Sequence, residues 1–383
     1  MDSFFKSTIY GDLTKMVQIV FNEASKKKVT LFGQTYIDRF FDFKNPQFGL
    51  TVSELMGDYK IRIMASLIAD KALTPVRSWE GAEKFTEKIP RFGHKTILNA
   101  DQLREIKNML ATQSISSDPA TRDAYEASKK QELINTMMGT VQETVLGTKD
   151  ALEYLFISAL FNAGIVEYNE LNNPEGIRYK IDYGMPESNK IKVESGYEWT
   201  KENLASGKVD PVEFLIDLIQ QFSDTMQFDA ILMHPKMRYN ILRSKYLRLA
   251  VRGVDKAATP IKEDELDQSL KGLGIPRFES IYKQNAVLKD GKRQNISPVS
   301  EDSIVLVPAG KIGVVRTAFE DNEIIPEKNV SYSNMSNGIR VAQWTVGESS
   351  GQAAGEYTQA SIRALPIITS INGILNVKVN NLG

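Results

Sequence analysis

The sequence predicts an α+β protein with an extended first half and a compact second half. Three observations support this prediction. A stretch that begins at Asp118 repeats apolar residues at helical spacing for longer than most globular helices. Short alternating segments, typical of strands, lie on both sides of it. After residue 198, helix and strand patterns follow each other closely, as they do in a compact domain.

Length and composition describe an ordinary globular chain. It has 383 residues, of which 42% are hydrophobic and 25% charged, so it can build a real core. The formal net charge of -1 disfavours a nucleic-acid binder that acts through a broad basic face. With no cysteine there is no disulfide framework and no thiolate metal site. The sequence shows neither a signal-peptide pattern nor an apolar run of membrane-spanning length, so we expect a soluble protein without a cleaved signal.

Large aromatic rings occur in a charged segment, residues 75–103, that glycine and proline interrupt. The rings are those of Trp79, Phe85 and Phe92. Strand-like alternation at 59–64 and at 94–99 predicts the two arms of an extended hairpin with a long irregular tip. Because exposed rings of this size need a cover, we expect another surface to lie over them.

The stretch from Asp118 to Gly164 predicts one long helix. Asp118 can cap the first free N–H groups, and Pro119 suits the first helical position because its missing donor costs nothing there. Gly139 and Gly147 allow a bend within the helix, and Gly164 is a suitable stop. Such a helix is longer than a small core requires, so we interpret it as a spine.

The second half combines helices and strands in quick succession. Asp210 and Pro211 predict the start of a helix over 210–226. A buried strand is predicted at 230–233, directly before a helix at 235–244. Further strands are predicted at 177–183, 190–195, 312–317 and 339–346; a hairpin with Gly291 at its tip is predicted between 278–288 and 303–310; and a final apolar strand pair is predicted at 365–371 and 374–379.

No group of residues predicts catalysis or metal binding. The two histidines, His94 and His234, lie far apart, so a His-rich metal site or a Ser-His-Asp triad is hard to build. The acidic run 320–327 lacks the ligand spacing of a calcium loop. The sequence 272-GLGIP-276 has a proline where a phosphate-binding loop needs a helix to begin. We therefore predict no catalytic residue, no metal and no cofactor.

One basic segment, 243-RSKYLRLAVRG-253, has two interpretations. The simpler one is a face of an amphipathic helix, and the alternative is a nucleic-acid site. A DNA affinity that falls with salt and is lost on substitution of Arg243 and Arg248 would favour the alternative.

Five segments, taken in order, carry a resemblance to a known family. They are 67-LIAD-70 with 75–103, the long helix from Asp118, 198–244, 270–319 and 357–379. Their order resembles the major capsid proteins of tailed phages, which have the Hong Kong 97 type fold. Among these the chain is most similar to the lambda-type major head protein, or capsid protein E, family. The segments correspond to the family's extended loop, spine helix, entry into the rear domain, strand and hairpin passage, and closing strands.

The resemblance implies a division of the chain into five parts. These are an N-terminal arm (1–55), an extended hairpin loop (56–105), a peripheral domain with the spine helix (106–198), an axial domain (199–346) and strands that return to the peripheral domain (347–383). It also implies a non-enzymatic protein that self-assembles into hexamers and pentamers of an icosahedral shell around phage DNA. Some members cross-link neighbouring subunits through a lysine, but no matching motif assigns such a lysine here.

The resemblance also implies partners and a location. The partners are other copies of the chain, scaffold, portal and decoration proteins, and packaged DNA through non-specific contacts, with no membrane. The location is the virion capsid, after assembly in the host cytoplasm. An alternative with the same fold is an encapsulin-type compartment that holds enzyme cargo. Neighbouring terminase and portal genes would indicate a phage, and a cargo peroxidase or ferritin-like gene a compartment.

The extended loop supplies the predicted contact residues between subunits. They are Arg77, Trp79, Phe85, Arg91 and Phe92. On this interpretation a neighbouring subunit covers the rings, and the charges set the register of the contact.

Overall fold

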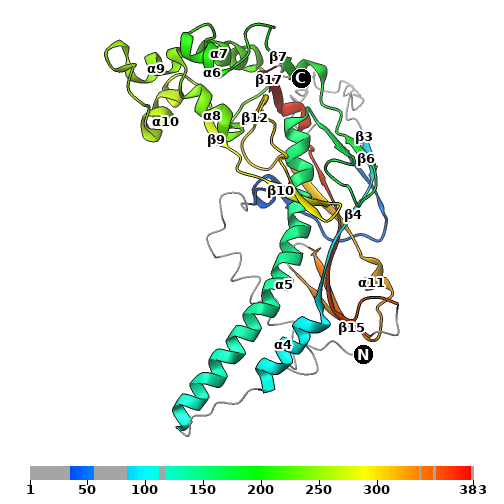
Figure 1. The fold of residues 1–383 in the computed structure, drawn as a ribbon. Helices are drawn as coiled ribbons and strands as arrows, with labels where there is room; N and C mark the ends of the chain where they lie inside the picture. Colours follow the sequence, from blue (N-terminus) through cyan, green and yellow to red (C-terminus); the bar gives the residue numbers. More distant parts are fainter. Residues whose placement is uncertain (1–34, 56–83, 112–117, 336–337, 348–350, 381–383) are drawn as a thin grey trace, which may run out of the picture.

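The computed structural model describes residues 35–55, 84–111, 118–335, 338–347 and 351–380. A long helix runs along the body, with sheets on one side and a lobe of short helices at one end (Figure 1). This mixture of helices and strands agrees with the predicted α+β class.

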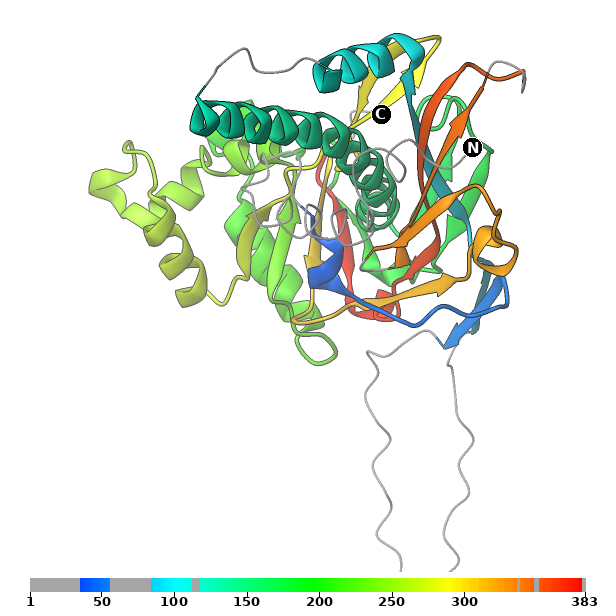
Figure 2. The ribbon, with the colours of Figure 1, turned by 90° about the horizontal axis from the view of Figure 1, so that it is seen from below.

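The long helix is α5, Pro119–Phe161, with 43 residues and a length of roughly 64 Å. The Asp118 side chain accepts the N–H of Thr121 at 3.0 Å, so the predicted cap is confirmed. The helix is unbroken at Gly139 and Gly147, and it ends before Gly164, which has a φ of +84°. Helix α4, Ala100–Ala111, lies beside the first part of α5 in both views (Figures 1 and 2).

A six-stranded sheet packs against α5. The strand order is β1-β13-β16-β15-β14, and β4 pairs with the other edge of β16. Most of β16 is buried, because α5 and neighbouring strands surround it. The strands are β1 (Phe41–Phe43), β4 (Arg91–Asn99), β13 (Gly313–Ala318), β14 (Ser331–Asn334), β15 (Arg340–Val346) and β16 (Gly355–Ile367).

A five-stranded sheet separates α5 from the helical lobe. Its side chains alternate between two cores: Leu232 and Val305 join the core around α5, while Ile231 and Ile304 join the core of the lobe. Burial on both faces explains why these strands are continuously apolar in the sequence. In the order β7-β17-β12-β8-β9, the strands are Lys190–Lys192, Leu375–Lys378, Ser303–Val307, Ala230–Met233 and Arg277–Ser280.

The helical lobe contains the helices predicted at 210–226 and 235–244. Asp210 caps α7 by accepting the N–H groups of Val212 and Glu213, and His234 caps α8. Trp199 is fully buried in this lobe, with its ring 5.6 Å from that of Phe214. The helices are α6 (Lys201–Ser206), α7 (Pro211–Phe222), α8 (Pro235–Ile241), α9 (Lys245–Arg252) and α10 (Glu263–Gly272).

Short elements complete the fold of the described ranges. In these ranges, no helix is long and apolar enough to cross a membrane. They include three antiparallel two-stranded ribbons: β2 (Thr51–Leu55) with β3 (Lys84–Lys88), β5 (Ile165–Tyr168) with β6 (Tyr179–Asp182), and β10 (Asn285–Lys289) with β11 (Lys292–Ile296). The others are α3 (Ile37–Phe40), α11 (Asp321–Ile324) and 3₁₀ turns at Glu187–Asn189, Val254–Lys256 and Ile371–Gly373.

The predicted hairpin around residues 59–99 is only partly correct. Residues 94–99 form a strand, but it belongs to β4 and pairs with β16, from Arg91 opposite Arg363 to Asn99 opposite Gly355. The other predicted arm, 59–64, lies outside the described residues. The ribbon that the structure shows at this place is β2 with β3. Alternation predicts that a segment is a strand, but it carries no information about a partner hundreds of residues away.

Two further strand pairings differ from prediction. Segments 365–371 and 374–379 do not pair, because β16 and β17 belong to different sheets and the 3₁₀ turn Ile371–Gly373 joins them. The turn at Gly291 is confirmed, with φ of +51° at Asp290 and +71° at Gly291, but its arms are β10 and β11. Strand β12 lies in the five-stranded sheet instead.

The predicted axial domain spans two of these groups of elements. Helices α6 to α10 form the lobe with the five-stranded sheet, whereas β13 to β15 belong to the six-stranded sheet. The division into arm, loop, peripheral and axial domains stays a prediction.

Candidate functional site

Three of the five predicted contact residues lie at the junction of β3 and β4. Phe85 is in β3, Arg91 and Phe92 begin β4, and Pro90 lies between the strands. Arg77 and Trp79 lie outside the described residues. The junction therefore forms the base of the predicted extended loop.

The same chain covers part of both described rings. The Phe85 ring stacks on that of Tyr183, with centroids 5.3 Å apart and an angle of 12° between the planes. The Phe92 ring lies 6.4 Å from that of Tyr168. Both rings are half-buried against the main core. These contacts correct the expectation that a neighbour provides the whole cover; a neighbour's contact with their open sides stays a prediction.

Arg91 belongs to a row of ion pairs. Its Nε lies 2.8 Å from a carboxylate oxygen of Glu320, which is 1% exposed. Burial raises the pKa of Glu320, and the nearby Arg91 opposes this rise. The next acidic residues are paired as well: Asp321 with Arg363 at 2.7 Å and Glu323 with Arg340 at 3.3 Å. The acidic run thus fastens the β3–β4 junction to the six-stranded sheet.

A cavity of about 720 Å³ opens beside Phe92. Its walls come from the β3–β4 junction, α5, the β5–β6 ribbon and the β10–β11 hairpin, and Arg363 of β16 also lines it. Its lining includes the aromatic side chains of Tyr154, Tyr168 and Tyr179 as well as Phe92. The β3–β4 junction therefore forms one wall of a concave site.

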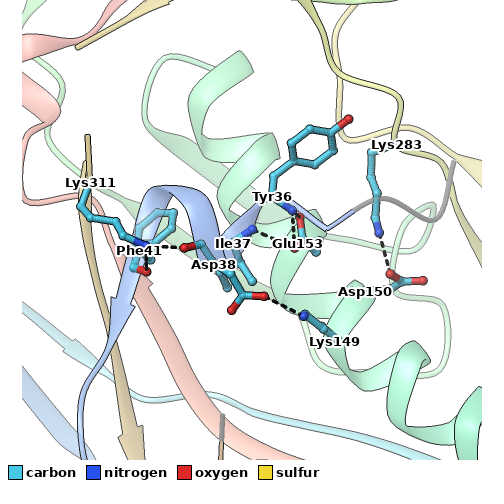
Figure 3. Close-up of polar contacts among 9 residues, drawn as sticks. All are labelled: Tyr36, Ile37, Asp38, Phe41, Lys149, Asp150, Glu153, Lys283 and Lys311. Carbon is cyan, nitrogen blue, oxygen red and sulfur yellow. Dashed lines mark hydrogen bonds and ion pairs between the residues drawn. The ribbon is translucent and has the colours of Figure 1, made fainter. Parts of the chain in front are cut away.

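The second candidate site is the base of the N-terminal arm, where the described chain begins (Figure 3). The Tyr36 N–H donates to both carboxylate oxygens of Glu153, at 2.9 and 3.0 Å, and the Ile37 N–H donates to one of them at 2.9 Å. Glu153 is on α5 and fully buried. One carboxylate thus binds two successive backbone N–H groups at the start of α3, which holds the arm base on the spine helix.

Lys149 and Lys311 strengthen this attachment, and the buried Lys283 forms an ion pair with α5 close to it. Lys149, one turn before Glu153, lies 2.9 Å from a carboxylate oxygen of Asp38. Lys311 donates to the backbone carbonyls of Asp38 and of Phe41, the latter at 3.0 Å. Lys283, whose side chain is fully buried, lies 2.6 Å from Asp150 on the same helix (Figure 3). After α3, β1 pairs in parallel with β13, so the arm base is also part of the sheet.

Burial dominates the electrostatics of this site. It raises the pKa of Glu153 to about 7, although the backbone hydrogen bonds and the nearby Lys283 and Lys149 favour the charged form. The sequence reasoning missed Glu153. A signal was present, because Glu153 is a carboxylate within the apolar run Leu152, Leu155 and Phe156, where a surface residue is not expected.

The two histidines do not form a site with other ligating residues. His234 accepts the Lys236 N–H as the cap of α8, and burial lowers its pKa. His94 is exposed on β4, beside Gly147 of α5. Among the residues that the structure describes, no group of three or more His, Asp or Glu side chains is arranged to hold a metal ion.

Comparison with known proteins decides the family. Residues 24–379 match the family described as phage major capsid protein E. The chain belongs to this family. The predicted resemblance to lambda-type head proteins is confirmed, and this major capsid protein is a structural protein of the virion that forms shells with other copies of itself.

One solved structure with a TM-score above 0.5 agrees with this fold. A prophage capsid protein of Escherichia coli CFT073 has 15% sequence identity and a TM-score of 0.53, with 96% of this chain and 99% of that chain covered. A phage-related protein of Bordetella bronchiseptica RB50 has 11% identity and a TM-score of 0.47, with coverage of 95% and 97%. A virus-like particle protein of Pyrococcus furiosus has 10% identity and a TM-score of 0.42, with coverage of 96% and 99%. A search of curated proteins finds no match.

Proposed function

We propose that this capsid protein forms hexamers and pentamers that close into an icosahedral head around phage DNA. Assembly takes place in the host cytoplasm with scaffold and portal proteins, and decoration proteins bind the finished shell. Family membership over nearly the whole chain is the observation that carries this proposal. The near-neutral net charge of -1 is suitable for a shell of identical subunits, because such subunits pack side by side without strong electrostatic repulsion.

Within the shell, we propose that the arm (1–55) and the extended loop (56–105) make the main contacts with neighbouring subunits. Two features support this assignment. The arm base is fixed to α5 by Glu153, and the loop base is fixed by the stacking of Phe85 on Tyr183. A closed shell needs several contacts per subunit, each burying more than about 1,000 Å². We propose that these two segments supply this area without a larger core.

The test uses two tryptophans with different predicted roles. Trp79→Ala is expected to fold normally, with an unchanged circular dichroism spectrum, but to form few particles by electron microscopy. Trp199→Ala is the control, because this ring is fully buried and its loss costs about 3–5 kcal/mol of folding stability. If Trp79→Ala unfolds the isolated subunit as Trp199→Ala does, Trp79 is a core residue and the contact role of the loop is wrong.

The contents of the same particles distinguish a phage head from a compartment that holds an enzyme. A head contains nucleic acid after assembly in infected cells, whereas a compartment contains a cargo protein. Particles that carry a defined enzyme and no nucleic acid would overturn the proposal in favour of the compartment.

A further inference from the structure

The first turn of α9 and the residue before its cap form one wall of a second cavity, in the helical lobe. Its volume is about 390 Å³, and three cationic side chains line it: Arg243, Lys245 and Arg248. The remaining lining residues are Ala205, Leu249 and Ala257, so no carboxylate lines the cavity. We call this feature the α9 basic cavity.

The three cations lack carboxylate partners, although nearby arginines have them. Arg238 pairs with Glu263, and Arg252 pairs with Glu265 at 2.9 Å. For Arg243, Lys245 and Arg248, the described part of the chain provides no carboxylate within 4.0 Å. The hydrogen bond seen for this group runs from Arg248 Nε to the Leu242 carbonyl at 3.3 Å. Three positive charges around one hollow repel each other, and a bound anion removes this cost.

The local structure places positive charge where a helix disfavours it. Ser244 caps α9 and Lys245 is its first residue, so Arg243 and Lys245 lie beside the positive end of the helix dipole. Positive side chains at the positive end of a helix dipole, with no carboxylate beside them to offset the repulsion, are typical of a functional site.

The aliphatic part of the exposed Lys245 side chain lies against the end of α6. Gly207, with a φ of +77°, follows α6 and lies so close that an added Cβ would be 2.9 Å from Lys245 Cδ. The aliphatic part of Lys245 therefore packs on the Gly207 backbone.

We propose that the α9 basic cavity binds phosphate groups of a nucleic-acid backbone. Guanidinium groups of Arg243 and Arg248 match pairs of phosphate oxygens, and Lys245 adds a point charge. Contacts of this kind do not read sequence. Packaged DNA is the source of the phosphate, and this part of the inference rests on the proposed function. The overall charge of -1 does not oppose it, because the positive charge is local.

The experiment compares two triple variants of the full chain. Arg243→Ala/Lys245→Ala/Arg248→Ala removes the cavity cations, and Lys289→Ala/Lys292→Ala/Arg293→Ala removes three cations from the β10–β11 hairpin. Both variants change the net charge equally. Binding of a short labelled DNA duplex is measured by fluorescence anisotropy at several salt concentrations, and inorganic phosphate is measured by calorimetry.

The cavity variant is expected to bind the duplex at least roughly tenfold more weakly, with a weaker salt dependence, while the hairpin variant binds like the wild type. Inorganic phosphate should compete for the same site. Equal losses in both variants, or no loss in either, would overturn the proposal. Binding of inorganic phosphate without binding of the duplex would overturn the nucleic-acid assignment. Circular dichroism confirms that the variants fold.

Electron microscopy of the same samples keeps the two proposals apart. If the wild type forms shells but shows no duplex binding, the inference about α9 fails and the head function stands. If the wild type forms no shells under any assembly condition, the proposed function fails whatever the DNA affinity.

Discussion

Replacing Glu153 by Gln removes the buried charge beneath the arm base and keeps an oxygen that accepts backbone N–H groups. In the wild type, Glu153 accepts the N–H groups of Tyr36 and Ile37 and is fully buried. The charged groups near it are Lys283, Lys149, Asp150 and Asp38. The substitution therefore tests the titration of Glu153 with little change of shape.

The size of the effect follows from the raised pKa. The pKa of Glu153 is about 7 in the folded protein, against an ordinary value of 4.5. The folded state thus holds the proton more tightly than the unfolded chain does. This contribution to stability is complete below about pH 4.5 and is lost as the pH rises to about 7. The full difference corresponds to roughly 3 kcal/mol.

Urea unfolding of the unassembled subunit, followed by tryptophan fluorescence, measures this effect. Between about pH 5 and pH 8, the wild type should lose roughly 2–3 kcal/mol more unfolding free energy than Glu153→Gln. Glu143→Gln is the control, because Glu143 is exposed on the same helix, and it should keep the wild-type pH dependence. If Glu153→Gln also keeps that dependence, the account of the arm base is wrong.

Two further substitution experiments test the packing. An added Cβ at Gly139 in α5 meets nothing within 4 Å, so Gly139→Ala should raise the free energy of unfolding by about 0.5–1 kcal/mol. An added Cβ at Gly313 would lie 2.0 Å from the Ile367 carbonyl oxygen, so Gly313→Ala should lower it by roughly 3 kcal/mol or more. Urea midpoints that shift in the same direction for both would contradict this. Phe85→Ala should lower the midpoint by the equivalent of roughly 1–3 kcal/mol, because the stack on Tyr183 is lost; an unchanged midpoint would mean that the ring serves only neighbouring subunits.

The sequence predicts elements whose signals are local. Asp118 and Pro119 mark the start of α5, and Asp210 and Pro211 mark the start of α7, because caps and first-turn prolines act within a few residues. The turn at Gly291 is similar, since the left-handed backbone favours glycine. These features depend on neighbouring residues alone.

Strand pairing and buried charge depend on the whole fold. The partner of β4 is β16, more than two hundred residues further along the chain, and nothing in residues 91–99 specifies it. The apolar neighbours of Glu153 indicate that it is buried, but they do not show that its partners are the backbone N–H groups of Tyr36 and Ile37. Lys283 looks like an ordinary surface residue until the segment that follows β9 lies against α5. The rings of Phe85 and Phe92 were recognised as needing a cover. Their partners lie in or next to the β5–β6 ribbon, since Tyr168 ends β5 and Tyr183 directly follows β6, and local patterns do not show that this ribbon lies beside them.

Cryo-electron microscopy of particles assembled from the full chain tests the central claim most directly. We expect closed shells in which residues 35–55 and the β2–β3 ribbon lie at contacts between subunits, with further density from residues 56–83 on a neighbour. Shells in which these segments face only solvent, or a protein that stays monomeric with its scaffold present, would contradict the account.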